Sequence, residues 1–303
     1  MCVAELTAES GLKAQTESAA YAALCTGDNL NCVTREKMEF RARVITALLG
    51  VPLLVLAIAK GQPWHFSLLV LLVTFAALGE YYKIVFLGLR TAKVVGLLCG
   101  ASVALAVVYL GQMAASLLLA PVLMAVMACY VFLPGSLRAK FDHLGWTVLG
   151  TFYIGCFVPH FVLLYRLASG KEWVFLILLV IMSGDSAGYF VGKAWGRNKL
   201  CPELSPNKTV EGAISIIVAG VLTGWLGGRI LLPDIGVGEL LLLGFVLAAL
   251  GQTGDLFESW IKRVFSVKDS GALLPGHGGI LDRIDSLIFP TVFATYYVRI
   301  MHP

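Results

Sequence analysis

Charged side chains are scarce in this sequence of 303 residues: they make up 14% of the chain, while hydrophobic residues make up 58%. A soluble chain of this length needs more charge to cover its surface, so the composition excludes an ordinary soluble protein and indicates a membrane protein. The formal net charge is only +4, and the basic residues form short clusters between apolar runs. We therefore expect no nucleic-acid partner and favour an anionic headgroup or a nucleotide as the ligand.

Cysteine pairing and a secretory signal are also missing. The seven cysteines show neither CxxC spacing nor a histidine at metal-ligand spacing, so we interpret them as free thiols, mostly buried in lipid, and expect no disulfide framework or zinc site. Residues 1–39 are polar and lack the apolar segment of a secretory signal peptide. Met38 directly precedes the first basic cluster, and our hypothesis is that translation starts there.

Long apolar runs fill the rest of the chain. A helix needs roughly 20 mainly apolar residues to cross the hydrocarbon core of a bilayer. The runs therefore predict an all-α, polytopic integral membrane protein with about nine transmembrane helices. The nine runs cover residues 42–59, 64–82, 93–112, 114–133, 145–166, 172–192, 210–232, 237–256 and 283–301.

Most loop lysines and arginines fall on one side of this nine-helix arrangement. Loops rich in Lys and Arg stay in the cytoplasm, so we expect a cytoplasmic amino terminus and a carboxyl terminus outside. We divide the chain into a polar cytoplasmic tail (residues 1–40), amino-terminal transmembrane helices (41–170) and a carboxy-terminal transmembrane region that carries the chemistry (171–303). Two polar stretches of this last region then lie on the cytoplasmic side.

The first polar stretch begins with a carboxylate inside an apolar run. Such a group is costly in a membrane and usually faces a cavity, a cation or a substrate, which makes Asp185 a candidate functional residue. Gly184, Gly188 and Gly192 recur every four residues. This spacing lets another helix approach closely, so helix packing alone also explains the glycines.

The same stretch continues into a predicted turn and helix start. Ser205 and Pro206 are expected to turn the chain, and Lys208 and Thr209 to open the next helix. Backbone N–H groups at a helix start, joined by an ammonium and a hydroxyl group, form a plausible phosphate-binding site. A cytoplasmic loop that binds lipid headgroups is the alternative.

The second polar stretch starts where the eighth apolar run ends. If that helix continues past the membrane surface, Asp255, Glu258, Ser259 and Lys262 share one face, because they lie at positions i, i+3, i+4 and i+7. Residues 275–279 contain proline and glycine and are expected to form a loop that approaches a ligand closely.

Two carboxylates flank this loop. Asp255 precedes it and Asp282 follows it, and Asp282 shares a helical face with Asp285 and Ser286. Oxygen ligands of this kind suit a divalent cation such as Mg²⁺. Ordinary ion pairing is the alternative, with the neighbouring basic residues Lys262, Arg263 and Arg283.

Together these motifs resemble those of the phosphatidate cytidylyltransferase (CDP-diacylglycerol synthase) family. The family's carboxy-terminal pattern is matched by Ser259, Lys262, Arg263, Lys268, Asp269, His277, Gly278, Gly279, Asp282, Arg283 and Asp285. Residues 185–189 and 205–212 also resemble the family, although Asn207 and Val210 stand where Lys and Trp are more frequent. The amino-terminal half is similar only in its apolar runs.

The resemblance implies an activity and its partners. CTP and phosphatidic acid would react to give CDP-diacylglycerol and pyrophosphate in phospholipid biosynthesis. The partners are then CTP, phosphatidic acid, membrane lipids and a second copy of the chain in a homodimer. The cofactor is Mg²⁺, with a second cation left open. The expected location is the bacterial inner (plasma) membrane, with the active site on the cytoplasmic side.

The candidate roles are assigned by residue. The catalytic candidates are Asp255, Asp282 and Lys262. The candidate metal ligands are Asp255 and Asp282, with Asp185 and Asp285 as further candidates. The candidate substrate-binding residues are Ser205, Lys208, Thr209, Ser259, Arg263, Lys268, His277, Gly278, Gly279 and Arg283.

Two other functions stay open at this point. A lipid kinase that phosphorylates a polyprenol with CTP would also need a metal and basic residues, but it requires a base and releases CDP. A secondary transporter would also place Asp185 in the membrane. Its charges should gather near the midplane, whereas these gather at one surface.

Overall fold

The computed structural model describes residues 50, 52, 54–271, 273 and 278–302. The chain divides into two units, Met1–Pro52 with Leu274–His277, and Leu53–Leu273 with Gly278–Pro303. Every element named below belongs to the second unit, which is described by itself. His277 lies outside the described residues, and the predicted run 42–59 is described mainly at its end, where residues 54–60 are helical.

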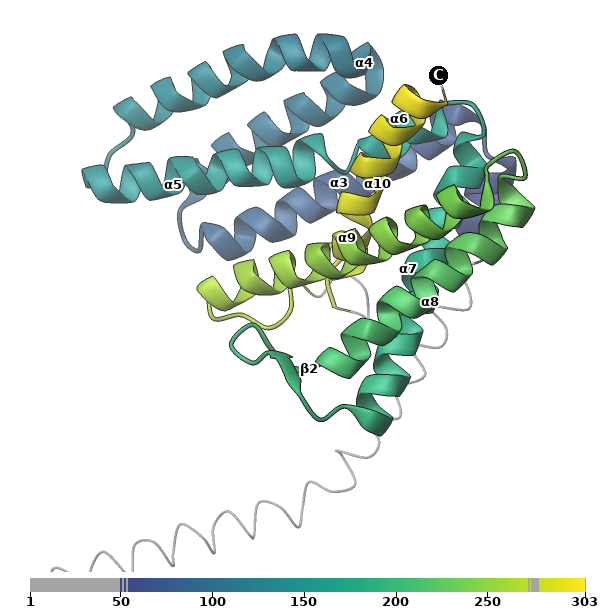
Figure 1. The fold of residues 1–303 in the computed structure, drawn as a ribbon. Helices are drawn as coiled ribbons and strands as arrows, with labels where there is room; N and C mark the ends of the chain where they lie inside the picture. The colour runs from purple at the N-terminus through teal and green to yellow at the C-terminus, as the bar shows by residue number, and fades with distance from the viewer. Residues whose placement is uncertain (1–49, 51, 53, 272, 274–277, 303) are drawn as a thin grey trace, which may run out of the picture. The chain divides into compact units, whose positions relative to one another are not determined.

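The amino-terminal part of this unit is built from helices (Figure 1). They are α3 (Pro63–Val85), α4 (Arg90–Phe132), α5 (Leu137–Gly150), the π-helical turn η1 (Thr151–Cys156) and α6 (His160–Tyr165). Within α4, Gly111 has a φ of 80°, a left-handed conformation that glycine adopts without strain. Figure 1 shows α4 doubling back on itself, which agrees with the two separate runs predicted at 93–112 and 114–133.

The carboxy-terminal part contains the longest uninterrupted helices and one β-hairpin. Its elements are α7 (Gly170–Trp195), β1 (Lys199–Cys201), β2 (Ser205–Thr209), α8 (Val210–Leu231), α9 (Val237–Val264) and α10 (Leu281–Met301). The two strands pair antiparallel, with Cys201 opposite Ser205. The prediction that Ser205 and Pro206 form the turn is therefore wrong: the turn lies at residues 202–204, and Pro206 is tolerated because a two-stranded hairpin consists of edge strands.

Six helices in the described part of the chain are long and apolar enough to cross a membrane. They are Pro63–Val85, Arg90–Gly111, Leu137–Tyr165, Gly170–Trp195, Val210–Leu231 and Val237–Val264. An all-α integral membrane protein fits this finding, but the predicted count of nine spans is not confirmed. Ser116–Phe132 is apolar but shorter, and α10, with Asp282, Arg283 and Asp285 near its start, is not among the six.

The end of α3 is fixed against α5 by two tyrosines. Tyr81 and Tyr82 are fully buried. The hydroxyl of Tyr82 donates to the carbonyl of Thr147 at 2.8 Å, and that of Tyr81 donates to the carbonyl of Trp146 at 3.1 Å. Because a buried hydroxyl needs a hydrogen-bond partner, these contacts hold the last turns of α3 in one position.

Small residues let α7, α8 and α9 pack closely. A Cβ atom added to Gly188 of α7 would lie 2.7 Å from Ile216 of α8, and one added to Gly224 of α8 would lie 2.5 Å from the Cα atom of Gly244 of α9. Real side chains do not approach so closely. The glycines repeated along α7 therefore do serve helix packing, as their spacing indicated.

We predict that Gly224→Ala destabilises the protein by roughly 1–3 kcal/mol, because the added methyl group meets the backbone of α9. Gly238→Ala is the matched control, since a Cβ atom there meets nothing within 4 Å. Thermal unfolding in detergent should show a lower midpoint for Gly224→Ala alone. Equal midpoints for the two variants would show that the α8–α9 contact tolerates a side chain.

Candidate functional site

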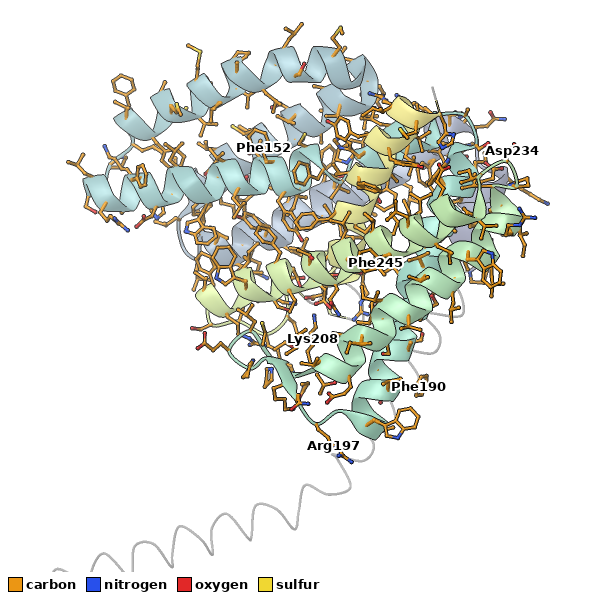
Figure 2. The ribbon with its side chains drawn as sticks, viewed as in Figure 1. Phe152, Phe190, Arg197, Lys208, Asp234 and Phe245 are labelled. Atoms are coloured by element: carbon orange, nitrogen blue, oxygen red, sulfur yellow. The ribbon has the colours of Figure 1, made fainter. Side chains whose placement is uncertain are left out.

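A cleft of about 580 Å³ lies between α7, α8 and α9. Its lining includes four of the predicted residues: Asp185 from α7, Lys208 and Thr209 from β2, and Asp255 from α9. Figure 2 shows Lys208 and Arg197 at the end where the β-hairpin lies, and Asp234 at the opposite end of α8 and α9. The two polar stretches of the sequence thus meet in one cleft, at one end of these helices.

An ion pair spans this cleft. Lys208 Nζ lies 2.6 Å from Asp255 Oδ2, and the two side chains are 24% and 35% exposed. The partners come from different polar stretches, and the Lys208 ammonium nitrogen itself is buried. An anionic ligand would compete with Asp255 for Lys208, and a cation would compete with Lys208 for Asp255.

The helix start predicted at Lys208 and Thr209 is confirmed. Thr209 is the N-cap residue of α8, and its Oγ1 accepts a hydrogen bond from the Gly212 N–H at 3.1 Å. The cap satisfies one of the N–H groups that the first turn leaves without a partner. Lys208 is therefore placed one residue before the positive end of the α8 dipole.

The β-hairpin is tied down on both sides. Glu211 of α8 accepts hydrogen bonds from the Arg197 N–H at 3.1 Å and from the Asn198 amide side chain at 2.9 Å. On the other side, Arg263 Nε of α9 donates to the carbonyl of Leu204 at 3.0 Å. The hairpin that carries Lys208 is thus held between two helices.

A second group of charges lies further along α9. This helix runs to Val264, and its 28 residues make it about 42 Å long, longer than a hydrocarbon core of about 30 Å. Lys262 Nζ contacts Glu258 Oε2 at 2.5 Å and Asp282 Oδ1 at 2.7 Å. Because all three side chains are at most 13% exposed, these charges depend on one another for stabilisation.

Asp282 is surrounded by hydrogen-bond donors. Besides Lys262, its carboxylate accepts from the Gly279 N–H at 2.9 Å, the Ser270 N–H at 3.0 Å and the Ser270 hydroxyl at 2.9 Å. Asp282 lies outside the six membrane-length helices. Burial raises the pKa of Asp282, but the hydrogen bonds from Lys262 and Gly279 outweigh it and lower this pKa to about 2. Asp282 is therefore ionised at physiological pH.

One residue of this site was missed in the sequence. Glu80 of α3 is only 8% exposed, and its carboxylate accepts hydrogen bonds from the Ser270 hydroxyl and from the N–H groups of Ile280 and Leu281. A signal was present, because Glu80 is a carboxylate inside an apolar run, as Asp185 is. What the run could not show is that Glu80 lies beside a loop 190 residues further along the chain.

The other predicted residues differ in their surroundings. Arg263, Lys268 and Asp269 are exposed at the end of α9 and in the loop that follows. Arg283 lines a separate, mainly apolar cavity of about 240 Å³. Gly278 has a φ of 81°. All the roles predicted for substrate binding stay predictions, for Ser205, Lys208, Thr209, Ser259, Arg263, Lys268, His277, Gly278, Gly279 and Arg283.

The carboxylates near the cleft are suited to a cation, although no ready-made metal site is seen. The described residues contain no group of three or more His, Cys, Asp or Glu side chains that could hold a metal ion. Asp185 and Asp255 both line the cleft, and the charge of Asp255 acts on both Asp185 and Asp285. A divalent cation would relieve this repulsion, and oxygen ligands suit Mg²⁺. The donor chemistry at Asp255 therefore fits Mg²⁺.

Asp282 fits a cation less directly. Both of its oxygens already accept hydrogen bonds, and Lys262 occupies Oδ1. A cation at Asp282 would have to replace this ammonium group. Lys262 would then keep Glu258 as its partner, at the 2.5 Å that the structure already shows.

The fold and the site define an integral membrane protein whose charged cleft suits a phosphorylated ligand. The sequence pattern of the Cytidylyltransferase family matches residues 41–301, which is most of the chain. The chain belongs to this family. The resemblance seen in its carboxy-terminal motifs is thereby confirmed.

Bacterial proteins named phosphatidate cytidylyltransferase are similar over part of their length. The one from Bacillus subtilis (strain 168) is 45% identical over 164 residues, 53% of this chain and 60% of the relative. The one from Brucella suis biovar 1 is 43% identical over 149 residues, 48% of this chain and 53% of the relative. The one from Staphylococcus saprophyticus is 38% identical over 153 residues, which are 50% of this chain and 58% of the relative. The chain thus matches between half and two thirds of these relatives.

We predict that Lys262→Met and Lys208→Met differ strongly in stability. Lys262→Met leaves Glu258 and Asp282 buried without their counterion and should cost roughly 3–5 kcal/mol. Lys208→Met removes a more exposed pair and should cost at most about 1 kcal/mol. Thermal unfolding of the two variants in the same detergent measures the difference. Equal losses would mean that the Lys262 cluster is better solvated than its burial indicates.

Proposed function

We propose that this chain is a CTP:phosphatidate cytidylyltransferase, which joins CTP and phosphatidic acid to give CDP-diacylglycerol and pyrophosphate. The observation that carries the proposal is the arrangement along α9. Asp255 faces the cleft beside Lys208, and Lys262, seven residues further on, contacts Asp282. Membership of the Cytidylyltransferase family and the names of the bacterial relatives support the same reaction.

We assign CTP to the cleft between α7, α8 and α9. Its volume of about 580 Å³ lies within the range of about 300–1,000 Å³ that small-molecule sites occupy. Lys208 and the first turn of α8 would bind the triphosphate, because an ammonium group and a helix N-terminus both favour negative charge. Ser205 and Thr209 lie on the same strand as Lys208, β2, and would add hydroxyl groups.

The reaction needs no covalent enzyme intermediate. A phosphate oxygen of phosphatidic acid attacks the α-phosphorus of CTP, the bond from this phosphorus to the bridging oxygen breaks, and pyrophosphate leaves. The attacking oxygen is already anionic, so no general base is required. Because two anions must approach each other, positioning and charge neutralisation supply most of the catalysis. The basic residues assigned to the remaining phosphate oxygens are Lys262, Arg263, Lys268 and Arg283.

Mg²⁺ is the proposed cofactor. The proposed ligands are Asp255 and Asp282, with Asp185 and Asp285 as further candidates. When bound, the ion neutralises negative charge on the triphosphate. Asp255 would contribute a carboxylate that already faces the cleft, and Asp282 would contribute one that Lys262 now contacts.

The proposed location is a bacterial inner membrane, with the site on the cytoplasmic side and nine spans in all. Two observations support the orientation. Lys208 and Arg197 lie at the hairpin end of α8 and α9 (Figure 2). The last turns of α7 and α9 are also basic, with Lys193, Lys262 and Arg263. Loops with this composition stay in the cytoplasm. A homodimer is also proposed, as the family resemblance implies.

We predict that the purified protein in detergent micelles converts phosphatidic acid and labelled CTP to labelled CDP-lipid when Mg²⁺ is present. Released pyrophosphate should match the lipid product mole for mole, and a chelator should stop both. If CDP is released with an isoprenoid alcohol while phosphatidic acid gives no product, the protein is a lipid kinase. If neither lipid reacts, the proposed function is wrong.

We also predict that Asp282→Asn lowers turnover by at least about 100-fold while the protein stays folded and membrane-inserted, because the proposed cation loses a charged ligand and the loop loses its acceptor. Asp142→Asn is the control: Asp142 forms an exposed pair with Arg138 on α5, at 3.3 Å. Initial rates at saturating CTP and lipid compare the two. Near-normal turnover of Asp282→Asn would remove Asp282 from the proposed metal site.

A further inference from the structure

We propose that Glu80, in the amino-terminal helices, is a positioning residue for the reaction: it holds the loop between α9 and α10 so that Asp282 stays in its working position. The inference rests on the proposed function, in which Asp282 acts beside the reacting phosphates. Neither the apolar run that contains Glu80 nor the motifs near Asp282 indicate it. It follows from contacts between α3 and the start of α10.

Glu80 caps α10 from another helix. The Ile280 N–H donates to Glu80 Oε1 at 3.1 Å, and the Leu281 N–H donates to Glu80 Oε2 at 3.0 Å. The N-cap residue of α10 is Ile280, whose side chain has no acceptor. The first N–H groups of a helix need acceptors, and the positive end of the helix favours a negative charge. Glu80 supplies both.

Ser270 links Glu80 to Asp282. The Ser270 hydroxyl lies 3.2 Å from Glu80 Oε2 and 2.9 Å from Asp282 Oδ2, and the Ser270 N–H donates to Asp282 as well. A hydroxyl has one proton, so the two carboxylates share a single donor. Glu80 and Asp282 therefore bind the two sides of one serine, and a displacement of one carboxylate changes the hydrogen bonding of the other.

The described ends of the loop between α9 and α10 both approach the Glu80 carboxylate. A Cβ atom added to Gly271 would lie 2.5 Å from Glu80 Oε1, and one added to Gly279 would lie 2.5 Å from Glu80 Oε2. Glycine at these two positions lets the backbone approach the carboxylate from both sides. This gives the glycines of the motif a role within the protein: Gly279 lies against Glu80 and donates its N–H to Asp282.

The position of Glu80 itself is fixed. The next two residues, Tyr81 and Tyr82, are fully buried and bonded to α5, so α3 cannot shift to follow the loop. A shift of about 1 Å at a reacting group can reduce the rate by about 100-fold. The fixed end of α3 therefore holds Glu80 in one position, and Glu80 in turn holds Asp282 in place through Ser270 and the start of α10.

The test compares Glu80→Gln with Glu239→Gln. Glutamine keeps the size of the side chain but turns one acceptor oxygen into an N–H donor that faces the donors of the loop. Glu239 also joins α9 to α10, at the other end of α10, where it binds Tyr297 and His302. Glu239 is 35% exposed. If a glutamate that contacts two helices only stabilises their packing, the two variants should behave alike.

We predict that Glu80→Gln lowers kcat by about 10- to 100-fold while the KM for CTP changes less than about threefold, since the CTP cleft does not include Glu80. Glu239→Gln should keep a near-normal kcat. Ser270→Ala should also lower kcat, and Glu80→Gln combined with Ser270→Ala should lose less than the product of the single losses. A normal kcat for Glu80→Gln, or equal losses in Glu80→Gln and Glu239→Gln, would overturn the proposal.

Hydrogen exchange gives a readout that does not depend on activity. In Glu80→Gln the amides of Ile280 and Leu281 should exchange faster than in the unmodified protein, because one of them loses its acceptor oxygen and faces an N–H donor instead. Unchanged exchange in Glu80→Gln would overturn the proposal about Glu80, whether or not the protein is active. Inactivity of the unmodified protein with CTP and phosphatidic acid would refute only the proposed function. If Glu80→Gln does not fold, Ser270→Ala decides, and a normal kcat there overturns the proposal.

Discussion

The buried contact of Lys262 with Glu258 and Asp282 is the constraint on which the site depends. An ammonium group taken out of water needs carboxylates at close range, and here the two partners come from α9 itself and from the start of α10. The contact joins the carboxyl end of α9 to the start of α10. It also places an ammonium group beside Asp282, one of the proposed ligands of Mg²⁺.

The cleft depends on a second constraint, the close packing of α7, α8 and α9. Glycines at the contacts bring the helices together, so that Asp185, Lys208 and Asp255 reach the same space. Larger residues would move the helices apart and separate these charges. Gly188 therefore has two roles that do not exclude each other. It lets α7 and α8 pack closely, and it lines the cleft.

Local patterns in the sequence were sufficient for the all-α class, for several helix boundaries and for part of the site, but the count of nine spans is not confirmed. The start of α8 at Thr209 and the extension of α9 past the eighth apolar run follow from spacing and capping rules, because these features depend on neighbours in sequence. The turn was misplaced at Ser205 because the contacts that hold the short hairpin come from Glu211 and Arg263 on two helices, and no local pattern reports them. Glu80 was missed for a similar reason: its partners are distant in sequence, and no periodicity reports such contacts.

The central claim is that CTP binds in the cleft between α7, α8 and α9, with its phosphates between Lys208 and the α9 carboxylates. An experimental structure of the protein with CTP and Mg²⁺ tests this most directly. The account predicts triphosphate density within hydrogen-bond distance of Lys208 and a cation at Asp255. Density for CTP at another place, with the Lys208–Asp255 ion pair unchanged, would contradict the claim.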